Sequence, residues 1–172
     1  DITLVADSMN LTNVTVQTTG AGVVTLKQNT NTTAIQVGTG AADGSGVLGL
    51  DNVELANIKS AGGLKIGSNS AGVSGNVTVV GAQTFLGTDL SGGTLTLQSD
   101  SGNITVNAAL GSPVNTTLST NTGDISFGAT GALTAATKAV TLSAAGGAIV
   151  GNNGATTNVS ANSLTATANK GI

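Results

Sequence analysis

The chain repeats a short apolar–polar–apolar pattern from one end to the other. In each copy one polar residue stands between two apolar ones, which is the two-residue period of a strand with one buried face. The copies are residues 2–4, 14–16, 24–26, 35–37, 64–66, 77–79, 95–97, 104–106, 125–127 and 140–142. Gly, Asn, Asp, Ser and Ala, which favour turns, separate the copies. Many short strands at recurring intervals predict a stacked or closed all-β architecture.

The spacing of these patterns favours one architecture in particular. The intervals vary too much for a strict tandem repeat, and they fit strands that keep register while the turns between them change length. We therefore predict a right-handed parallel β-helix (β-solenoid) that occupies residues 1–172 as a single segment without a linker. The side chains expected in its core are those of Ile35, Val37, Leu64, Ile66, Val77, Val79, Ile104 and Val106.

One segment departs from the strand pattern. Leu55 and Ile58 have helical spacing, Asp51 precedes them as a candidate N-cap, and Glu54 follows Asp51 at the spacing of a capping box. We predict one or two helical turns over residues 52–58, inserted between strands on the outside of the molecule. Such an insertion is expected to act as a capped loop over an exposed edge of the core rather than as a binding feature.

The amino-acid composition predicts a narrow core and argues against nucleic acid as a partner. The 172 residues include 26 Gly, one Pro and two Phe, with no Cys, His, Trp or Tyr, so Ala, Val, Leu and Ile must fill a narrow core. A net charge of -3 with only five basic residues argues against nucleic acid as a partner. Disorder is the competing interpretation of a chain rich in Gly, Ser and Thr, but the regularly placed Val, Ile and Leu argue against it.

The two ends of the sequence carry the same strand pattern as the middle. Asp1-Ile2-Thr3-Leu4 already belongs to a strand, and Lys170-Gly171-Ile172 resembles the start of another. We expect both ends to be cuts through a continuing pattern, so the chain either belongs to a longer polypeptide or meets copies of itself end to end. No apolar run approaches the ~18–20 residues that cross a membrane.

Candidate chemistry is sparse. Without His or Cys, nucleophilic triads and imidazole or thiolate metal sites are absent. The acidic residues are scattered rather than paired, at Asp7, Asp43, Asp51, Glu54, Asp89, Asp100 and Asp124. Asp43, Asp89 and Asp100 are predicted to be turn residues rather than calcium ligands. We therefore predict no enzyme activity, no catalytic residue, no cofactor and no metal.

Asparagine is frequent in the turns. Asn-x-Ser/Thr sequences begin at Asn10, Asn13, Asn31, Asn76, Asn103, Asn115 and Asn158. A chain this rich in Asn and Thr forms such sequences by chance. Asn residues at equivalent turns are instead expected to stack into amide ladders, as they do in other repetitive β structures.

A longer phrase in the first half resembles a known family. It runs from Ala34 to Gly38, continues as Gly46-Val47-Leu48-Gly49-Leu50-Asp51-Asn52-Val53-Glu54-Leu55 with Ile58, and ends as Gly63-Leu64-Lys65-Ile66-Gly67. It is similar to the repeat of large bacterial exoproteins of the filamentous-haemagglutinin type, which use two-partner secretion. The segments Gly123–Phe127, Gly146–Ile149, Asn158–Ala161 and Leu164–Ala168 share the style of these proteins.

The resemblance implies a β-helical segment of a secreted surface fibre or filamentous adhesin, outside a Gram-negative bacterium. Its partners would be further strands of itself, surface glycans of a host or the environment, and an outer-membrane transporter during export. A carbohydrate-binding adhesin module is the main alternative, although missing Tyr and Trp weaken it. A polysaccharide lyase or hydrolase and an ice-binding surface of Thr-x-Thr arrays remain further alternatives.

Overall fold

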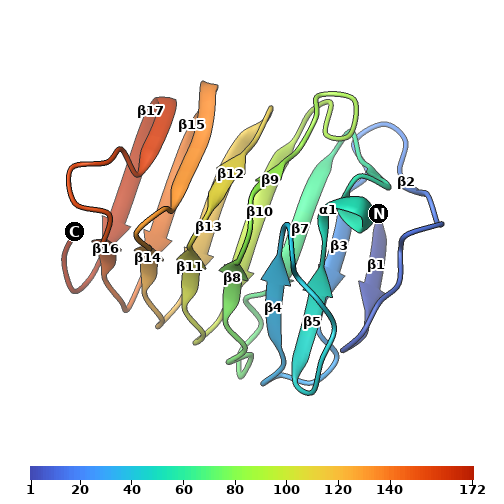
Figure 1. The fold of residues 1–172 in the computed structure, drawn as a ribbon, viewed down its shortest axis with the longest axis horizontal. Helices are drawn as coiled ribbons and strands as arrows, with labels where there is room; N and C mark the ends of the chain where they lie inside the picture. The colour runs from blue at the N-terminus through green and yellow to red at the C-terminus, as the bar shows by residue number, and fades with distance from the viewer.

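The strands lie side by side along the long axis of an elongated molecule. The computed structural model describes residues 1–172, and the two ends of the chain lie at opposite ends of the long axis (Figure 1). Every pairing between strands is parallel, and the only antiparallel contact is an isolated bridge between Gly44 and Val47. The strand-to-strand hydrogen bonds therefore follow the long axis.

The strands form three sheets. The nine-stranded sheet contains β1 (Ile2–Val5), β3 (Val24–Lys27), β7 (Gly63–Ser68), β9 (Gln83–Thr84), β10 (Thr94–Ser99), β12 (Ala109–Gly111), β13 (Asn115–Thr120), β15 (Ala132–Ala144) and β17 (Val159–Ala168). The six-stranded sheet contains β4 (Ala34–Val37), β5 (Val47–Leu50), β8 (Val77–Val79), β11 (Ile104–Val106), β14 (Ile125–Phe127) and β16 (Ile149–Gly151). The third sheet pairs β2 (Val16–Gln17) with β6 (Ile58–Lys59).

The predicted right-handed parallel β-helix (β-solenoid) is wrong for this structure. β15 pairs with both β13 and β12, so the nine strands form one curled half-barrel, and the other two parallel sheets are separate from it. β15 runs through thirteen residues because an irregularity between Ala135 and Ala139 bends the strand without ending it. β5 lies outside β4 at the sheet edge, so the strand order also departs from a regular coil.

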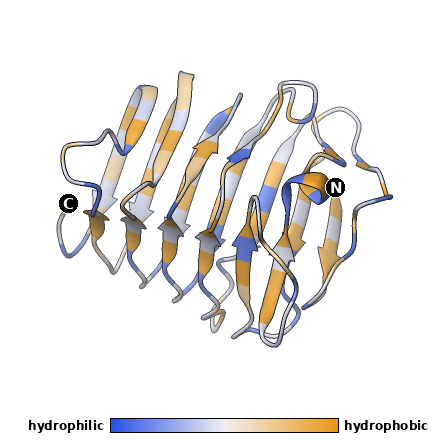
Figure 2. Ribbon diagram, in the orientation of Figure 1, coloured by the Kyte–Doolittle hydropathy of each residue, from blue (hydrophilic) through white to orange (hydrophobic).

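The core consists of aliphatic side chains aligned in columns across the sheets. One column of the nine-stranded sheet contains Leu4, Leu26, Ile66, Leu97, Leu118, Leu142 and Ala166. A column of the six-stranded sheet contains Leu48, Ile35, Val77, Ile104, Ile125 and Ile149. Figure 2 shows the alternating apolar and polar bands along the strands. Buried side chains from all three sheets join into a single apolar cluster.

The eight core side chains predicted from the sequence are all fully buried. The expectation over residues 14–16 is wrong in part, because Val14 is 50% exposed and β2 begins only at Val16. Strands β5, β6, β9, β12, β13, β16 and β17 lie where the apolar–polar–apolar pattern did not place one. Polar, small or glycine residues interrupt the pattern in these strands.

The predicted helix is present but shorter than expected. α1 (Asn52–Leu55) makes one turn, and Ile58 already belongs to β6. Its capping box is confirmed: the Asp51 side chain accepts from the Glu54 N–H at 2.9 Å, and the Glu54 carboxylate accepts from the Asp51 N–H at 3.1 Å. Leu55 and Ile58 are fully buried and anchor the turn in the core, while Asn52 and Val53 are exposed, as expected for an insertion on the outside of the molecule.

Two glycines allow neighbouring segments of backbone to approach closely. Gly67 has a φ of +88°, and a Cβ there would lie 2.1 Å from the Gln98 carbonyl oxygen. Gly38 has a φ of +98°, and a Cβ there would lie 2.2 Å from the Gly81 carbonyl oxygen. Only glycine combines this backbone conformation with this spacing.

Candidate functional site

The half-buried Asp7 side chain binds the turn of the neighbouring strand connection. It accepts hydrogen bonds from the N–H groups of Asn29 and Thr30 at 3.0 and 2.8 Å, and from the Thr30 hydroxyl at 2.6 Å. The hydrogen bonds from Thr30, its side chain foremost, lower the pKa of Asp7 below the ordinary 3.8. Asp7 is therefore held as an anion that supports a turn.

Asp100 has the same role in the middle of the molecule. One carboxylate oxygen accepts from the Asn121 amide at 2.8 Å, and the other accepts from the Gly72 N–H at 2.9 Å. The Asn121 hydrogen bond is the main cause that lowers the pKa of Asp100 below 3.8. Asp100 thus bridges the turns on either side of it and, like Asp7, is already bound by the protein's own donors.

Three acidic residues line a polar pocket of about 270 Å³ beside α1: Asp43, Asp51 and Glu54. Asp43 accepts from the Ser8 hydroxyl at 2.6 Å and from the Gly49 N–H at 2.8 Å. Glu54 accepts from the buried Leu11 N–H at 3.0 Å. These bonds hold residues 8–11 across the N-terminal end of the core. Asp43 and Glu54 therefore stabilise the position of this segment.

Asp89 differs from the other acids because it is paired with a lysine. Its carboxylate is 5% exposed and forms an ion pair with the Lys59 ammonium, which also donates to the Ala56 carbonyl at 2.7 Å. The sequence predicted Asp43, Asp89 and Asp100 to be turn residues. All three lie between strands and accept backbone or neighbouring side-chain donors, as predicted.

The predicted amide ladder is wrong, because no hydrogen bond joins two Asn side chains; a ladder of side-chain-to-backbone hydrogen bonds follows one edge of the six-stranded sheet instead. The Asn76 side-chain oxygen accepts from the Asn103 N–H at 2.8 Å, and the Asn103 oxygen accepts from the Asp124 N–H at 2.9 Å. The Asp124 carboxylate continues the series to the Ala148 N–H at 2.8 Å. Each side chain therefore satisfies the backbone of the equivalent turn in the next strand connection.

A second ladder, built from hydroxyl groups, was not predicted. The Ser99 hydroxyl donates to the Gly75 carbonyl at 2.9 Å and accepts from the Gly102 N–H at 3.1 Å. The Thr120 hydroxyl repeats this arrangement with Gly102 and Gly123, at 3.0 and 3.1 Å. The signal in the sequence was a Ser or Thr three residues before a Gly, directly after a strand pattern.

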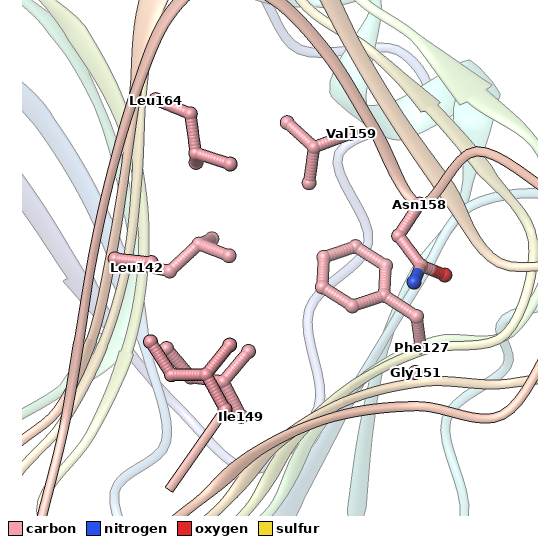
Figure 3. Close-up of a pocket in the computed structure, with 9 residues that line it drawn as sticks. Phe127, Leu142, Ile149, Gly151, Asn158, Val159 and Leu164 are labelled. Carbon is pink, nitrogen blue, oxygen red and sulfur yellow. The ribbon is translucent and has the colours of Figure 1, made fainter.

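The largest apolar opening lies where the strand stack ends at β17. A pocket of about 350 Å³ there is lined by Phe127, Leu142, Ile149, Gly151, Asn158, Val159, Leu164, Ala166 and Ile172. Figure 3 shows the Leu142, Leu164 and Val159 side chains pointing into the same space as the Phe127 ring. Leu164 is 52% exposed and Ile172 is 78% exposed. We call this surface the β17 face.

The β17 face has no catalytic equipment. Its lining contains one amide, Asn158, and no charged side chain. It offers exposed apolar side chains and one edge of β17, which pairs only with β15. Sequence reasoning named Ile172 as the possible start of a further strand, but it did not place Leu164 on an exposed face.

Side-chain charge is distributed unevenly along the long axis. Residues 1–54 contain five acidic residues and one lysine, whereas residues 125–172 contain two lysines and no acidic residue. The end that carries β1 is therefore negative, and the end that carries β17 is weakly positive.

No group of three His, Cys, Asp or Glu side chains is arranged to hold a metal ion. None of the helices has the length and apolar character needed to span a membrane. Comparison of the chain with protein-family models, with curated proteins and with solved structures finds no match.

Proposed function

We propose that this chain is a structural and adhesive segment of a secreted bacterial surface fibre or filamentous adhesin. The observation that carries the proposal is the single apolar core that follows the long axis, with strands stacked in register from β1 to β17. Such a stack gains length by adding strands at about 4.8 Å each. Its product is a rod, which is what a fibre requires.

The polar residues support the same interpretation. Asp7, Asp43, Asp100 and Asp124 each bind donors of the protein's own turns, and Asp89 binds Lys59. The hydrogen-bonding oxygens of these residues are already used within the protein, where they stabilise the turns of the rod. The proposal therefore assigns the acidic residues to stability, with no reaction to perform.

The proposed location is the surface of a Gram-negative bacterium, with export through an outer-membrane transporter by two-partner secretion. The phrase at Leu48–Gly67 supports this route through its resemblance to the repeat of filamentous-haemagglutinin-type exoproteins. The absence of Cys is compatible with export of an unfolded chain, since no disulfide has to form on arrival.

Immunogold electron microscopy of the producing cells tests the proposal. Antibodies raised against the 172-residue protein are expected to label filaments outside the outer membrane. Denaturing electrophoresis of sheared filaments then separates a single giant polypeptide from an assembly of small subunits. Labelling confined to the cytoplasm would contradict the proposal.

A carbohydrate-binding adhesin module is the second candidate. A shallow groove of about 320 Å³ supports it, because Thr84, Thr134 and Thr137 line the groove with hydroxyl groups that can bind sugars. A glycan array probed with the purified protein separates the two candidates. Selective glycan binding that is weakened by Thr134→Ala would favour the carbohydrate-binding module. Absence of binding to every glycan on the array would favour the structural role.

A further inference from the structure

We propose that the β17 face binds the β1 edge of a second copy of this chain, so that copies stack head to tail. This inference deepens the proposed function by naming the partner and the register of the contact, and it rests on that function for its biological setting. The contact is heterologous, because two different surfaces of the chain meet.

The first support is the continuity of the side-chain columns. Within the nine-stranded sheet Ile2, Val24, Leu64, Leu95, Thr116, Val140 and Leu164 occupy one column. Placing β1 of a second copy beside β17 in the same register sets Ile2 next to Leu164. The next inward position then sets Leu4 next to Ala166. Every pairing between long strands of this sheet already has this alignment.

The exposure of these side chains fits the contact. Leu164 points into the apolar pocket yet remains 52% exposed, whereas the members of its column between Ile2 and Leu164 have a neighbouring strand on each side. Ile2 and Leu4 are also only partly buried, although they pack against the core. Docking β1 on β17 would remove all three from water.

The backbone offers matching free edges. β1 pairs only with β3, and β17 pairs only with β15, so each strand has one edge of unpaired N–H and C=O groups. Within the sheet the Ile2 N–H donates to the Val23 carbonyl at 2.9 Å. The Leu164 N–H lies at the equivalent position and would donate to the Asp1 carbonyl of the second copy.

Charge favours a head-to-tail contact over a tail-to-tail contact. The end with β1 carries five acidic residues and one lysine, and the end with β17 carries Lys138 and Lys170 without an acidic residue. Opposite signs meet when β1 docks on β17, whereas two β17 faces would bring like charges together. The contact is centred on β1, because Leu48 and Leu50 of β5 are already buried in the same copy.

Cysteine cross-linking tests both the partner and the register, since the native chain contains no cysteine. Thr3 and Thr165 are exposed, outward-facing residues that lie side by side in the proposed contact. Thr3→Cys protein with an affinity tag is mixed with untagged Thr165→Cys protein and oxidised. We expect a heterodimer that denaturing electrophoresis resolves from both monomers.

A matched variant checks the register. Thr167→Cys moves the thiol two residues along β17, about 6.6 Å from the aligned position, which is outside the range of an unstrained disulfide. The Thr3→Cys and Thr165→Cys mixture is expected to give about tenfold more heterodimer than the Thr3→Cys and Thr167→Cys mixture. Equal yields, Thr165→Cys homodimers in excess, or no cross-link up to the solubility limit would each overturn the proposal.

A second measurement uses the apolar contact. Leu164→Asp is expected to abolish concentration-dependent association in sedimentation velocity, with an unchanged melting temperature because the side chain is half exposed. Leu86→Asp adds the same charge at a 58% exposed leucine between β9 and β10, and it should associate like the native protein. A native chain that stays monomeric at every concentration would overturn the proposal and leave the β17 face to another protein or to further residues of the same polypeptide.

The two proposals fail separately. Surface filaments made of one giant polypeptide, together with no cross-link, would retain the fibre function and remove the head-to-tail contact. A specific cross-link from a protein confined to the cytoplasm would retain the contact and remove the surface function.

Discussion

At the scale of single residues, polar side chains here serve the protein's own backbone. The Asn76 and Asn103 amides, the Ser99 and Thr120 hydroxyls and the Asp7 and Asp100 carboxylates all bind turns of neighbouring strand connections. Short parallel strands leave many backbone groups in corners, where no sheet partner is available. Side chains supply those partners, which explains why a chain so rich in Asn, Ser and Thr forms a defined structure.

The fully buried Val77 gives the first prediction. Val77→Asp would place a carboxylate without a partner between Ile35 and Ile104, so we expect a loss of at least about 3 kcal/mol in the free energy of unfolding. Urea denaturation followed by circular dichroism measures this loss. Thr78→Asp, at the adjacent outward position, is the control, and equal losses in the two variants would contradict the assignment of Val77 to the core.

Gly67 gives the second prediction. Gly67→Ala combines a positive φ with a Cβ that would lie 2.1 Å from the Gln98 carbonyl oxygen, so we expect a loss of about 2 kcal/mol or more. Gly44 has no positive φ and nothing within 4 Å of an added Cβ, which makes Gly44→Ala the matched control. The two thermal unfolding midpoints decide the outcome, and similar midpoints would contradict a close approach at Gly67.

The third prediction concerns acid. Because the folded-state pKa values of Asp7 and Asp100 lie below the ordinary 3.8, their stabilisation is complete above that pH and is lost as the pH falls through the lowered values. Asp100→Asn cannot titrate, so its melting temperature should decline less than that of the native protein in this acid range. Asn121→Ala removes the main cause of the lowered pKa of Asp100 and should also flatten the decline. Parallel curves for all three proteins would refute this.

At the scale of elements, α1 holds neighbouring segments of the chain in place. Its single turn is too short to be stable alone, and the capping box together with buried Leu55 fixes it. Glu54 extends this fixation to residues 8–11 by accepting from the Leu11 N–H. The turn thereby closes the end of the core near β5.

The fourth prediction compares the two acids of the capping box. Asp51→Ala removes one cap and should cost about 1 kcal/mol. Glu54→Ala should cost more, about 1–3 kcal/mol, because it also leaves the buried Leu11 N–H without a partner. Chemical denaturation ranks the variants, with Val53→Ala at a 55% exposed position as the control. A smaller loss for Glu54→Ala than for Asp51→Ala would rule out its second role.

The elements that were predictable share one property, which is a regular alternation of aliphatic and polar residues. Strands such as β8 and β11 follow it, and their inward residues are all buried. β13 does not, because Thr116 occupies an inward position where the hydroxyl donates to the Val114 carbonyl at 3.2 Å. β9 likewise buries Gln83 at an inward position, although its side-chain oxygen has no hydrogen-bond partner. A hydropathy pattern does not identify a polar residue as part of the core, so these two strands were not predicted.

The joining of strands into sheets was less predictable than the strands themselves. Nothing in the sequence between Ala135 and Ala139 distinguishes a bend from a break. Only residues 140–142 of β15 were predicted as a strand, and the curled half-barrel was missed. The β17 face was missed for a related reason. Leu164 has the spacing of a core residue, and only the sheet order shows that no strand covers it.

At the scale of the whole molecule, the two ends differ. Residues 8–11 cross the end near β1 and are fastened by Asp43 and Glu54, whereas the β17 face remains apolar and open. Local stability should follow this difference, because strands with two neighbours open less readily than strands with one.

The fifth prediction applies hydrogen exchange to this difference. Amides of β17 are expected to exchange fastest among the long strands, and those of β10 slowest, because β10 is paired on both sides by β7 and β13. Mass spectrometry of peptides from each strand measures the order. Cross-linking through Thr3→Cys and Thr165→Cys should slow exchange in β17 and leave β10 unchanged. Equal protection of β17 and β10 in the free protein would contradict the open end.

The alignment of the strand-to-strand hydrogen bonds with the long axis has a mechanical consequence. A pull along that axis loads these bonds directly, with the bonds between two neighbouring strands sharing the force and successive pairs of strands bearing it in series. Adding strands would therefore lengthen such a rod without strengthening it. Its breaking force would be set by the weakest junction between two strands, whether that junction lies within a chain or between two chains.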